Sequence, residues 1–182
     1  MTSHTLCIGL DPGWESFGFA VMKNGTLLVT GNLVPSSYSD LRDFCEDLAY
    51  KLSLNLYGLD DTVYVTMERF VAYKNILSSA SENILMVIGA VALMFQQGDV
   101  SPGLVRAIDW KPEVMKYLAR TKDLTNPFTS FDKKFSAWAA AQLTGDTGTL
   151  KSTHEADAIC LSFLPYIKEY NANRTRPVSN AK

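Results

Sequence analysis

The chain has 182 residues, of which 47% are apolar and 20% are charged, and its formal net charge is −2. These values are typical of one globular domain with a proper core, and they argue against a generic, strongly basic nucleic-acid binder. No basic-then-apolar leader stands at the N-terminus, and the most apolar run, residues 84–95, is shorter than the roughly 18 residues that span a membrane. We therefore expect a cytoplasmic protein without membrane association.

Charge is distributed unevenly along the chain. Residues 1–63 carry three basic and eight acidic side chains, whereas residues 104–136 carry seven basic and four acidic ones. A locally basic stretch on an acidic chain indicates a confined site for a polyanion, although a solvated helix face has the same composition.

Hydrophobic periodicity and turn signals predict the elements in chain order. The dipeptides Pro12-Gly13 and Asn24-Gly25 separate apolar runs, so three antiparallel strands are expected to open the chain. Further on, helical spacing alternates with short apolar or β-branched runs. The expected strands are residues 6–10, 17–22, 26–34, 62–67 and 103–109, and the expected helices are residues 40–57, 78–97, 111–120, 132–143 and 154–170.

This order predicts an α/β fold. Three antiparallel strands followed by α-separated parallel strands form a mixed five-stranded sheet with helices on both faces. We expect a single domain over residues 1–170 and a flexible basic tail over residues 171–182. The helix at 78–97 is apolar nearly all round, so it is expected to be buried in the core or at a subunit interface.

Three acidic residues stand at element ends where a sheet can bring them together. Asp11 ends the first strand, Glu68 follows the fourth, and Asp157 lies in the first turn of the last helix, with His154 on the same face. Each alone has an ordinary explanation as a turn former, a surface acid or a helix N-terminal residue. Together they predict a cation site, because converging carboxylates repel one another strongly in a low dielectric.

The residue types in this group indicate the metal and the reaction. Oxygen ligands suit Mg²⁺ or Mn²⁺, and a histidine is tolerated best by Mn²⁺. Two such ions about 4 Å apart would clamp a phosphodiester for in-line attack by water. The group therefore favours phosphodiester hydrolysis.

The same residues carry a family resemblance that covers nearly the whole chain. Asp11-Pro12-Gly13 with Gly18, the strand-ending Glu68 and the pair His154-x-x-Asp157 resemble the motifs of the RuvC family of Holliday junction resolvases, in the RNase H-like superfamily. Further segments that resemble the family are residues 68–75, 110–116 and 132–133.

The resemblance implies a homodimeric endonuclease that cuts two opposed strands of a four-way DNA junction and leaves 5′-phosphate and 3′-hydroxyl ends. It implies two Mg²⁺ ions per site, with Mn²⁺ as a substitute, held by Asp11, Glu68 and Asp157. His154 would be a fourth ligand or a group near the leaving oxygen. The dimer interface would be helix 78–97. A small acidic chain of this kind suggests a phage-type member that acts in the host cytoplasm.

The resemblance also implies contacts with DNA. The family places an aromatic wedge three residues after its catalytic Glu, where this chain has Val71, so either Phe70 or Tyr73 would take that role. Lysines would contact phosphates, which positions DNA without reading its sequence. The expected DNA-binding residues are Phe70, Tyr73, Lys74, Lys111, Lys116, Lys133 and Lys134.

Three other functions compete with this interpretation. Another RNase H-like nuclease, acting on RNA–DNA hybrids, flaps or forks, would need the same metals. An ATPase of the actin and sugar-kinase type also opens with an Asp-x-Gly hairpin, but it needs two such domains, for which 182 residues leave no room. A non-catalytic junction-binding protein would have no reason to keep mutually repelling carboxylates.

Overall fold

The computed structural model describes residues 5–53, 62–71, 78–145 and 152–175, and a five-stranded sheet forms its centre. The strands lie in the order β3-β2-β1-β4-β5. Neighbours among β1, β2 and β3 are antiparallel, whereas β4 pairs in parallel with both β1 and β5. The predicted mixed sheet is therefore confirmed. The bounds are Thr5–Asp11 for β1, Phe17–Lys23 for β2, Thr26–Leu33 for β3, Thr62–Glu68 for β4 and Gly103–Val105 for β5.

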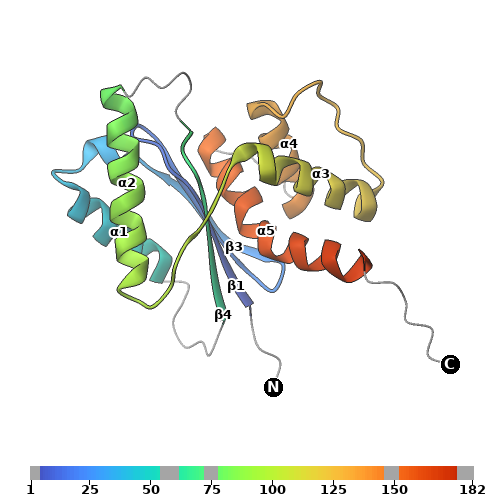
Figure 1. Ribbon diagram of the computed structural model, residues 1–182, viewed down its shortest axis with the longest axis horizontal. Helices are drawn as coiled ribbons and strands as arrows, with labels where there is room; N and C mark the ends of the chain where they lie inside the picture. Colours follow the sequence, from blue (N-terminus) through green and yellow to red (C-terminus); the bar gives the residue numbers. More distant parts are fainter. Residues whose placement is uncertain (1–4, 54–61, 72–77, 146–151, 176–182) are drawn as a thin grey trace.

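Helices cover both faces of the sheet, as the sequence predicted. Helices α1 and α2 lie on one face, and α3, α4 and α5 lie on the other (Figure 1). The apolar side chains form two clusters accordingly, one on each side of the sheet. The helices run over Leu41–Ser53 (α1), Ser79–Gln96 (α2), Ala107–Lys122 (α3), Lys133–Thr144 (α4) and Thr153–Thr175 (α5), and a 3-10 turn at Pro35–Ser37 precedes α1.

The predicted boundary between the fifth strand and the following helix was wrong. Strand β5 is three residues long, and α3 begins at Ala107 instead of Lys111. The physical reason is the Arg106–Asp109 pair: the guanidinium donates to the carboxylate at 2.8 and 2.9 Å, and the Asp109 N–H bonds back to the Arg106 carbonyl. This contact closes the first turn early, so Pro112 lies inside the helix.

The predicted ends of the first and last helices lie close to residues that the structure does not describe. The predicted end of the first helix, residues 54–57, lies outside them, and α1 is described to Ser53. Helix α5 continues to Thr175, past its predicted end at Tyr170. The rest of the predicted tail, residues 176–182, lies outside the described residues, and its flexibility stays a prediction.

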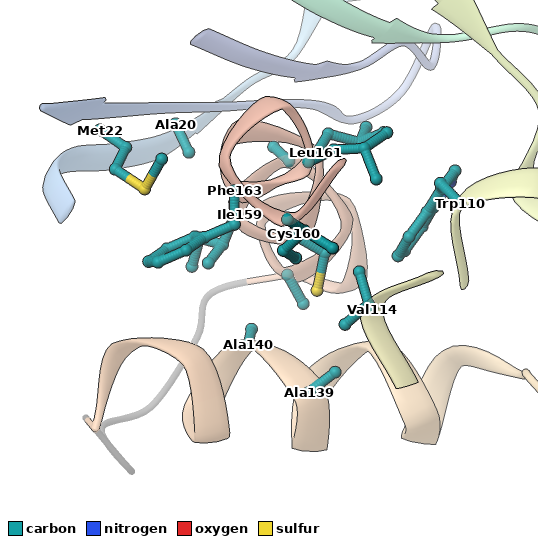
Figure 2. Close-up of a cluster of buried hydrophobic side chains, with 14 of the residues drawn as sticks. Ala20, Met22, Trp110, Val114, Ala139, Ala140, Ile159, Cys160, Leu161 and Phe163 are labelled. Atoms are coloured by element: carbon teal, nitrogen blue, oxygen red, sulfur yellow. The ribbon is translucent and has the colours of Figure 1, made fainter. Parts of the chain in front are cut away.

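Two glycines let α5 lie directly on the sheet. A Cβ at Gly9 of β1 would come within 2.0 Å of the Ala158 carbonyl oxygen, and one at Gly18 of β2 within 2.0 Å of the His154 carbonyl oxygen. On its other sides α5 packs against α3 and α4, where Trp110 and small side chains fill the space between the helices (Figure 2). The start of α5 is therefore held at one place above β1 and β2.

Helix α2 presents an apolar face to solvent. Val87 and Val91 are buried, but Leu85, Met86 and Leu93 are 45%, 51% and 62% exposed. By length and composition alone this helix could cross a membrane, and 11% of it is buried. One of the two expectations for this helix, burial in the core, was therefore wrong.

Candidate active site

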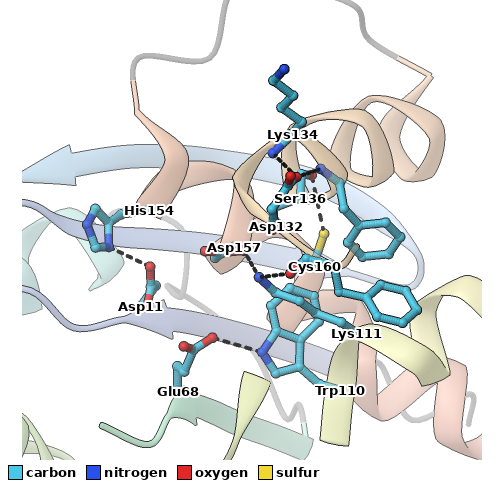
Figure 3. Close-up of polar contacts among 12 residues, drawn as sticks. Asp11, Glu68, Trp110, Lys111, Asp132, Lys134, Ser136, His154, Asp157 and Cys160 are labelled. Carbon is cyan, nitrogen blue, oxygen red and sulfur yellow. Dashed lines mark hydrogen bonds and ion pairs between the residues drawn. The ribbon is translucent and has the colours of Figure 1, made fainter. Parts of the chain in front are cut away.

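Asp11 lies at the end of the central strand, which explains its burial. Strand β1 has β2 on one side and β4 on the other, and the Asp11 residue is 5% exposed. Its Oδ2 lies 2.5 Å from Nδ1 of His154, in the first turn of α5 (Figure 3). This hydrogen bond raises the pKa of His154, against the opposing effect of burial. The contact therefore favours the charged form of the imidazole.

Glu68 lies beside Asp11 because β4 runs parallel to β1. The strand register pairs Leu10 with Met67, so the next residues of the two strands end together. Burial and, after it, the Asp11 charge raise the pKa of Glu68 to about 7, against a hydrogen bond from Trp110 that lowers the pKa. Glu68 is thus close to half-protonated near neutral pH without a cation.

Asp157 supplies the third carboxylate, one turn after His154 on α5. Burial raises its pKa, the Asp11 charge acts in the same direction, and the Lys111 charge opposes them. Its Oδ1 is buried and accepts no hydrogen bond, and the nearest ammonium, Nζ of Lys111, is 3.8 Å away. This buried oxygen is incompletely compensated, which is costly unless a cation or water joins it.

Two neighbouring residues of α3 reach into the same space. The indole Nε1 of Trp110 donates to Oε2 of Glu68 at 2.8 Å. Lys111 is 8% exposed, and its ammonium lies 3.5 Å from the Phe131 carbonyl oxygen and 5.1 Å from the centre of the Trp110 ring. Helix α3 therefore contacts two carboxylates, one through each residue (Figure 3).

Known proteins resemble this chain in fold. Neither a protein-family model nor a curated protein matches the sequence. Among solved structures, Thermus thermophilus RuvC in complex with Holliday junction substrate has a TM-score of 0.64 and 15% identity, over 92% of this chain and 96% of that chain. A second Thermus thermophilus RuvC structure has a TM-score of 0.61 and 16% identity, over 92% and 97%. The chain has the RuvC fold. This confirms the RNase H-like fold expected from the motifs.

On this RuvC-like fold, the two lysines at the start of α4 are exposed. Asp132 caps the helix, as predicted, by accepting hydrogen bonds from the N–H groups of Lys134 and Phe135 at 2.8 and 3.2 Å. The charge of Lys133 lowers the pKa of His154, so this lysine lies close enough to act on the site. Their predicted contacts with DNA stay predictions.

The remaining predicted DNA-binding residues are more scattered. Phe70 is partly buried just after β4. Lys116 is exposed on α3 and pairs with Glu113 at 2.6 Å. Tyr73 and Lys74 lie outside the described residues. Lys111, expected to contact a phosphate, instead lies nearly buried beside Asp157, and a phosphate role for it stays a prediction.

Sequence analysis missed a polar network that holds the start of α5. Oδ1 of Asn32 accepts hydrogen bonds from Ser16 at 2.8 Å and from Ser152 at 3.2 Å. The Ser152 hydroxyl in turn accepts from the N–H of Glu155 at 3.1 Å, as a helix cap does. The only sequence signal was a serine just before the helix. Trp110 was given no role, although it begins the segment 110–116 that resembles the RuvC family.

The donor set fits a divalent cation in its chemistry. Burial and the Asp11 charge raise the pKa values of Glu68 and Asp157, and Asp157 has a buried oxygen without a hydrogen bond. Over the described part of the chain, no three His, Cys, Asp or Glu side chains are already gathered as a metal site. In these positions Asp11 is engaged by His154 and Glu68 by Trp110.

Proposed function

We propose that this chain is a metal-dependent, structure-specific endonuclease that resolves four-way DNA junctions. Paired symmetric cuts would leave 5′-phosphate and 3′-hydroxyl ends. The observation that supports the proposal is that the charge of Asp11, at the end of β1, acts on both Glu68 of β4 and Asp157 of α5, in a fold shared with a RuvC bound to Holliday junction substrate. Such an enzyme would act where cellular or phage DNA recombines, in the cytoplasm.

The proposed cofactor is Mg²⁺, two ions per site, with Mn²⁺ as a substitute. Asp11, Glu68 and Asp157 would hold the ions, with His154 as a further ligand or a group near the leaving oxygen. When bound, the ions would activate water and stabilise the leaving oxygen. The raised pKa of Glu68 supports this, since a cation would replace the proton that repulsion otherwise favours.

The protein's own groups would orient the phosphodiester and move protons. Nδ1 of His154 lies 2.5 Å from Oδ2 of Asp11, and the His154 side chain is 33% exposed, so the imidazole would be placed to exchange a proton with a bound substrate. Lys111 brings a positive charge into a nearly buried position, where charge acts more strongly than at the surface.

Binding of junction DNA would use the basic residues around this edge. Lys133 supports the proposal because it is exposed and its charge is felt at His154. The other proposed phosphate contacts and the aromatic residues that would open the junction are Lys74, Lys111, Lys116, Lys134, Phe70 and Tyr73.

We also propose a homodimer that pairs through α2. Two symmetric cuts need two sites related by a two-fold axis, and a two-fold interface uses the same surface on both subunits. The exposed residues Leu85, Met86, Gly89 and Leu93 recur at helical spacing along α2, so they form one apolar stripe. Such a stripe is typical of a helix that packs on a partner.

Cleavage of matched substrates tests the proposal. An immobile four-way junction, the corresponding linear duplex and an RNA–DNA hybrid are incubated with the protein in Mg²⁺ or in EDTA. We expect Mg²⁺-dependent cleavage of the junction alone. Cleavage of the hybrid or the duplex instead of the junction would indicate an RNase H-like nuclease with a different substrate. Binding without cleavage in any metal would favour a non-catalytic junction-binding protein.

A further inference from the structure

The indole of Trp110 connects α3 to the end of β4. Its Nε1 donates to Oε2 of Glu68 at 2.8 Å, although 42 positions separate the two residues in the chain. Trp110 is 1% exposed, so this bond is shielded from water. An indole has one N–H and no acceptor, and the Glu68 carboxylate satisfies it.

The Trp110 ring is held in place by its surroundings. Its backbone N–H bonds to the Arg106 carbonyl at 3.2 Å, in the turn closed by the Arg106–Asp109 pair. The ring belongs to the buried cluster that also contains Val114 and Leu118 of α3 and side chains of α5 (Figure 2). A donor fixed in this way defines where one oxygen of Glu68 lies.

Glu68 needs such a partner because its neighbours repel it. Asp11, at the end of the neighbouring parallel strand β1, and Asp157 of α5 are both close enough for their charges to act on Glu68. Without the bond, an ionised Glu68 would lower its electrostatic energy by turning away from the other two carboxylates. With it, Oε2 is taken by the indole and Oε1 is left for a cation.

We propose that Trp110 is a positioning residue that holds Glu68 ready to bind the metal. The proposal rests on the proposed function, since Glu68 must be a ligand for its orientation to matter. Hydrogen bonds to ligating carboxylates commonly change metal affinity by about 10- to 100-fold. Trp110 would therefore act on metal binding, before any DNA is present.

The test compares two tryptophan variants. Trp110→Phe keeps an aromatic ring in the core and removes the N–H. Trp138→Phe is the matched control, because Trp138 is partly buried against the same cluster and its ring packs on Phe135 with centroids 5.9 Å apart. Mn²⁺ binding is measured by titration calorimetry without DNA, after thermal melts show that each variant folds. We expect Trp110→Phe to bind Mn²⁺ about tenfold more weakly or worse, and Trp138→Phe to bind as the wild type does.

The outcomes separate this proposal from the proposed function. Equal Mn²⁺ affinity of Trp110→Phe and wild type, with loss of binding in Asp11→Asn, would overturn the role of Trp110 and leave the metal site intact. No Mn²⁺ or Mg²⁺ binding by the wild type would overturn the proposed function and the role of Trp110 with it.

A second measurement needs no change at Trp110. The chain has three tryptophans, so ¹⁵N-labelled wild-type protein shows three indole N–H signals, assigned with Trp14→Phe and Trp138→Phe. We expect the Trp110 signal to exchange slowly with solvent, to shift in Glu68→Gln and to shift when Mg²⁺ is added, while the Trp138 signal stays. A Trp110 signal that Mg²⁺ leaves unchanged would contradict the proposal.

Discussion

The imidazole of His154 lies 2.5 Å from the carboxylate of Asp11, although 143 positions separate the two residues in the chain. Two glycines explain how this contact is reached. Gly18 pairs with Asp11 across the first hairpin, and the absence of a side chain there lets the His154 carbonyl lie against the sheet. Gly9 does the same one turn further along α5, under Ala158. Backbone packing therefore places the site.

Gly18→Ala should separate the two residues. The added Cβ would come within 2.0 Å of the His154 carbonyl oxygen, so the start of α5 must lift. We expect a loss of about 3 kcal/mol in the free energy of unfolding, from overpacking, and a loss of Mn²⁺ binding. Gly103→Ala is the control, since its Cβ would meet nothing closer than 3.6 Å. Denaturant unfolding and calorimetry measure both effects, and equal behaviour of the two variants would contradict this account.

Asp11→Asn should abolish cleavage and retain junction binding. The amide keeps the shape of the side chain but removes the central charge that acts on Glu68, His154 and Asp157. Gel-shift and cleavage assays on the same labelled junction measure both properties. Metal-dependent cleavage by a clean preparation of this variant would defeat the assignment of the site.

The stability of the metal-free protein should fall as pH rises from about 4.5 to 7. Glu68 has a pKa of about 7 in the folded protein against an ordinary value of 4.5, so the folded state binds its proton more tightly. A carboxyl group whose pKa is higher in the folded state than in the unfolded state stabilises the fold while it is protonated. That stabilisation is complete below the pKa of the unfolded state and is lost as pH rises through the pKa of the folded state. The pKa shifts of Asp157 and His154 act in the same direction.

Glu68→Gln should therefore stabilise the metal-free protein above pH 7. The difference between 4.5 and about 7 corresponds to on the order of 3 kcal/mol. The amide oxygen can still accept from Trp110, so packing is kept. Thermal melts in EDTA from pH 4.5 to 8 should show a flatter curve for the variant than for the wild type. Parallel curves of melting temperature against pH would mean that the pKa of Glu68 is not raised in the folded protein.

Leu93→Glu should convert the proposed dimer to a monomer. Leu93 is 62% exposed on the apolar stripe of α2, so a charge there would not disturb the core but would oppose burial in an interface. Leu28→Glu is the control, at 45% exposure on the edge strand β3. Light scattering during gel filtration measures the mass. A wild-type monomer, or a Leu93→Glu dimer, would contradict pairing through α2.

The sequence predicted the sheet and the acidic residues because both depend on local patterns. Turn dipeptides marked the hairpins, and Asp11 and Glu68 stood directly after apolar strands. Contacts that depend on the packing of distant elements were missed. Trp110 was expected between the fifth strand and the next helix, whereas α3 begins at Ala107 and its Trp110 donates to Glu68.

The exposure of α2 could not be predicted for a different reason. A helix that is apolar nearly all round has the same pattern in a core and in an interface. The packing of Val87 and Val91, with Leu93 left exposed, shows that this helix is not buried in the core on all sides.

The most direct test of the central claim is strand mapping on an immobile four-way junction whose four strands are labelled in turn. The account predicts Mg²⁺-dependent nicks at symmetric positions on two opposed strands, with ends that DNA ligase can seal. Nicks on a single strand, on adjacent strands, or with ends that ligase cannot seal would contradict it.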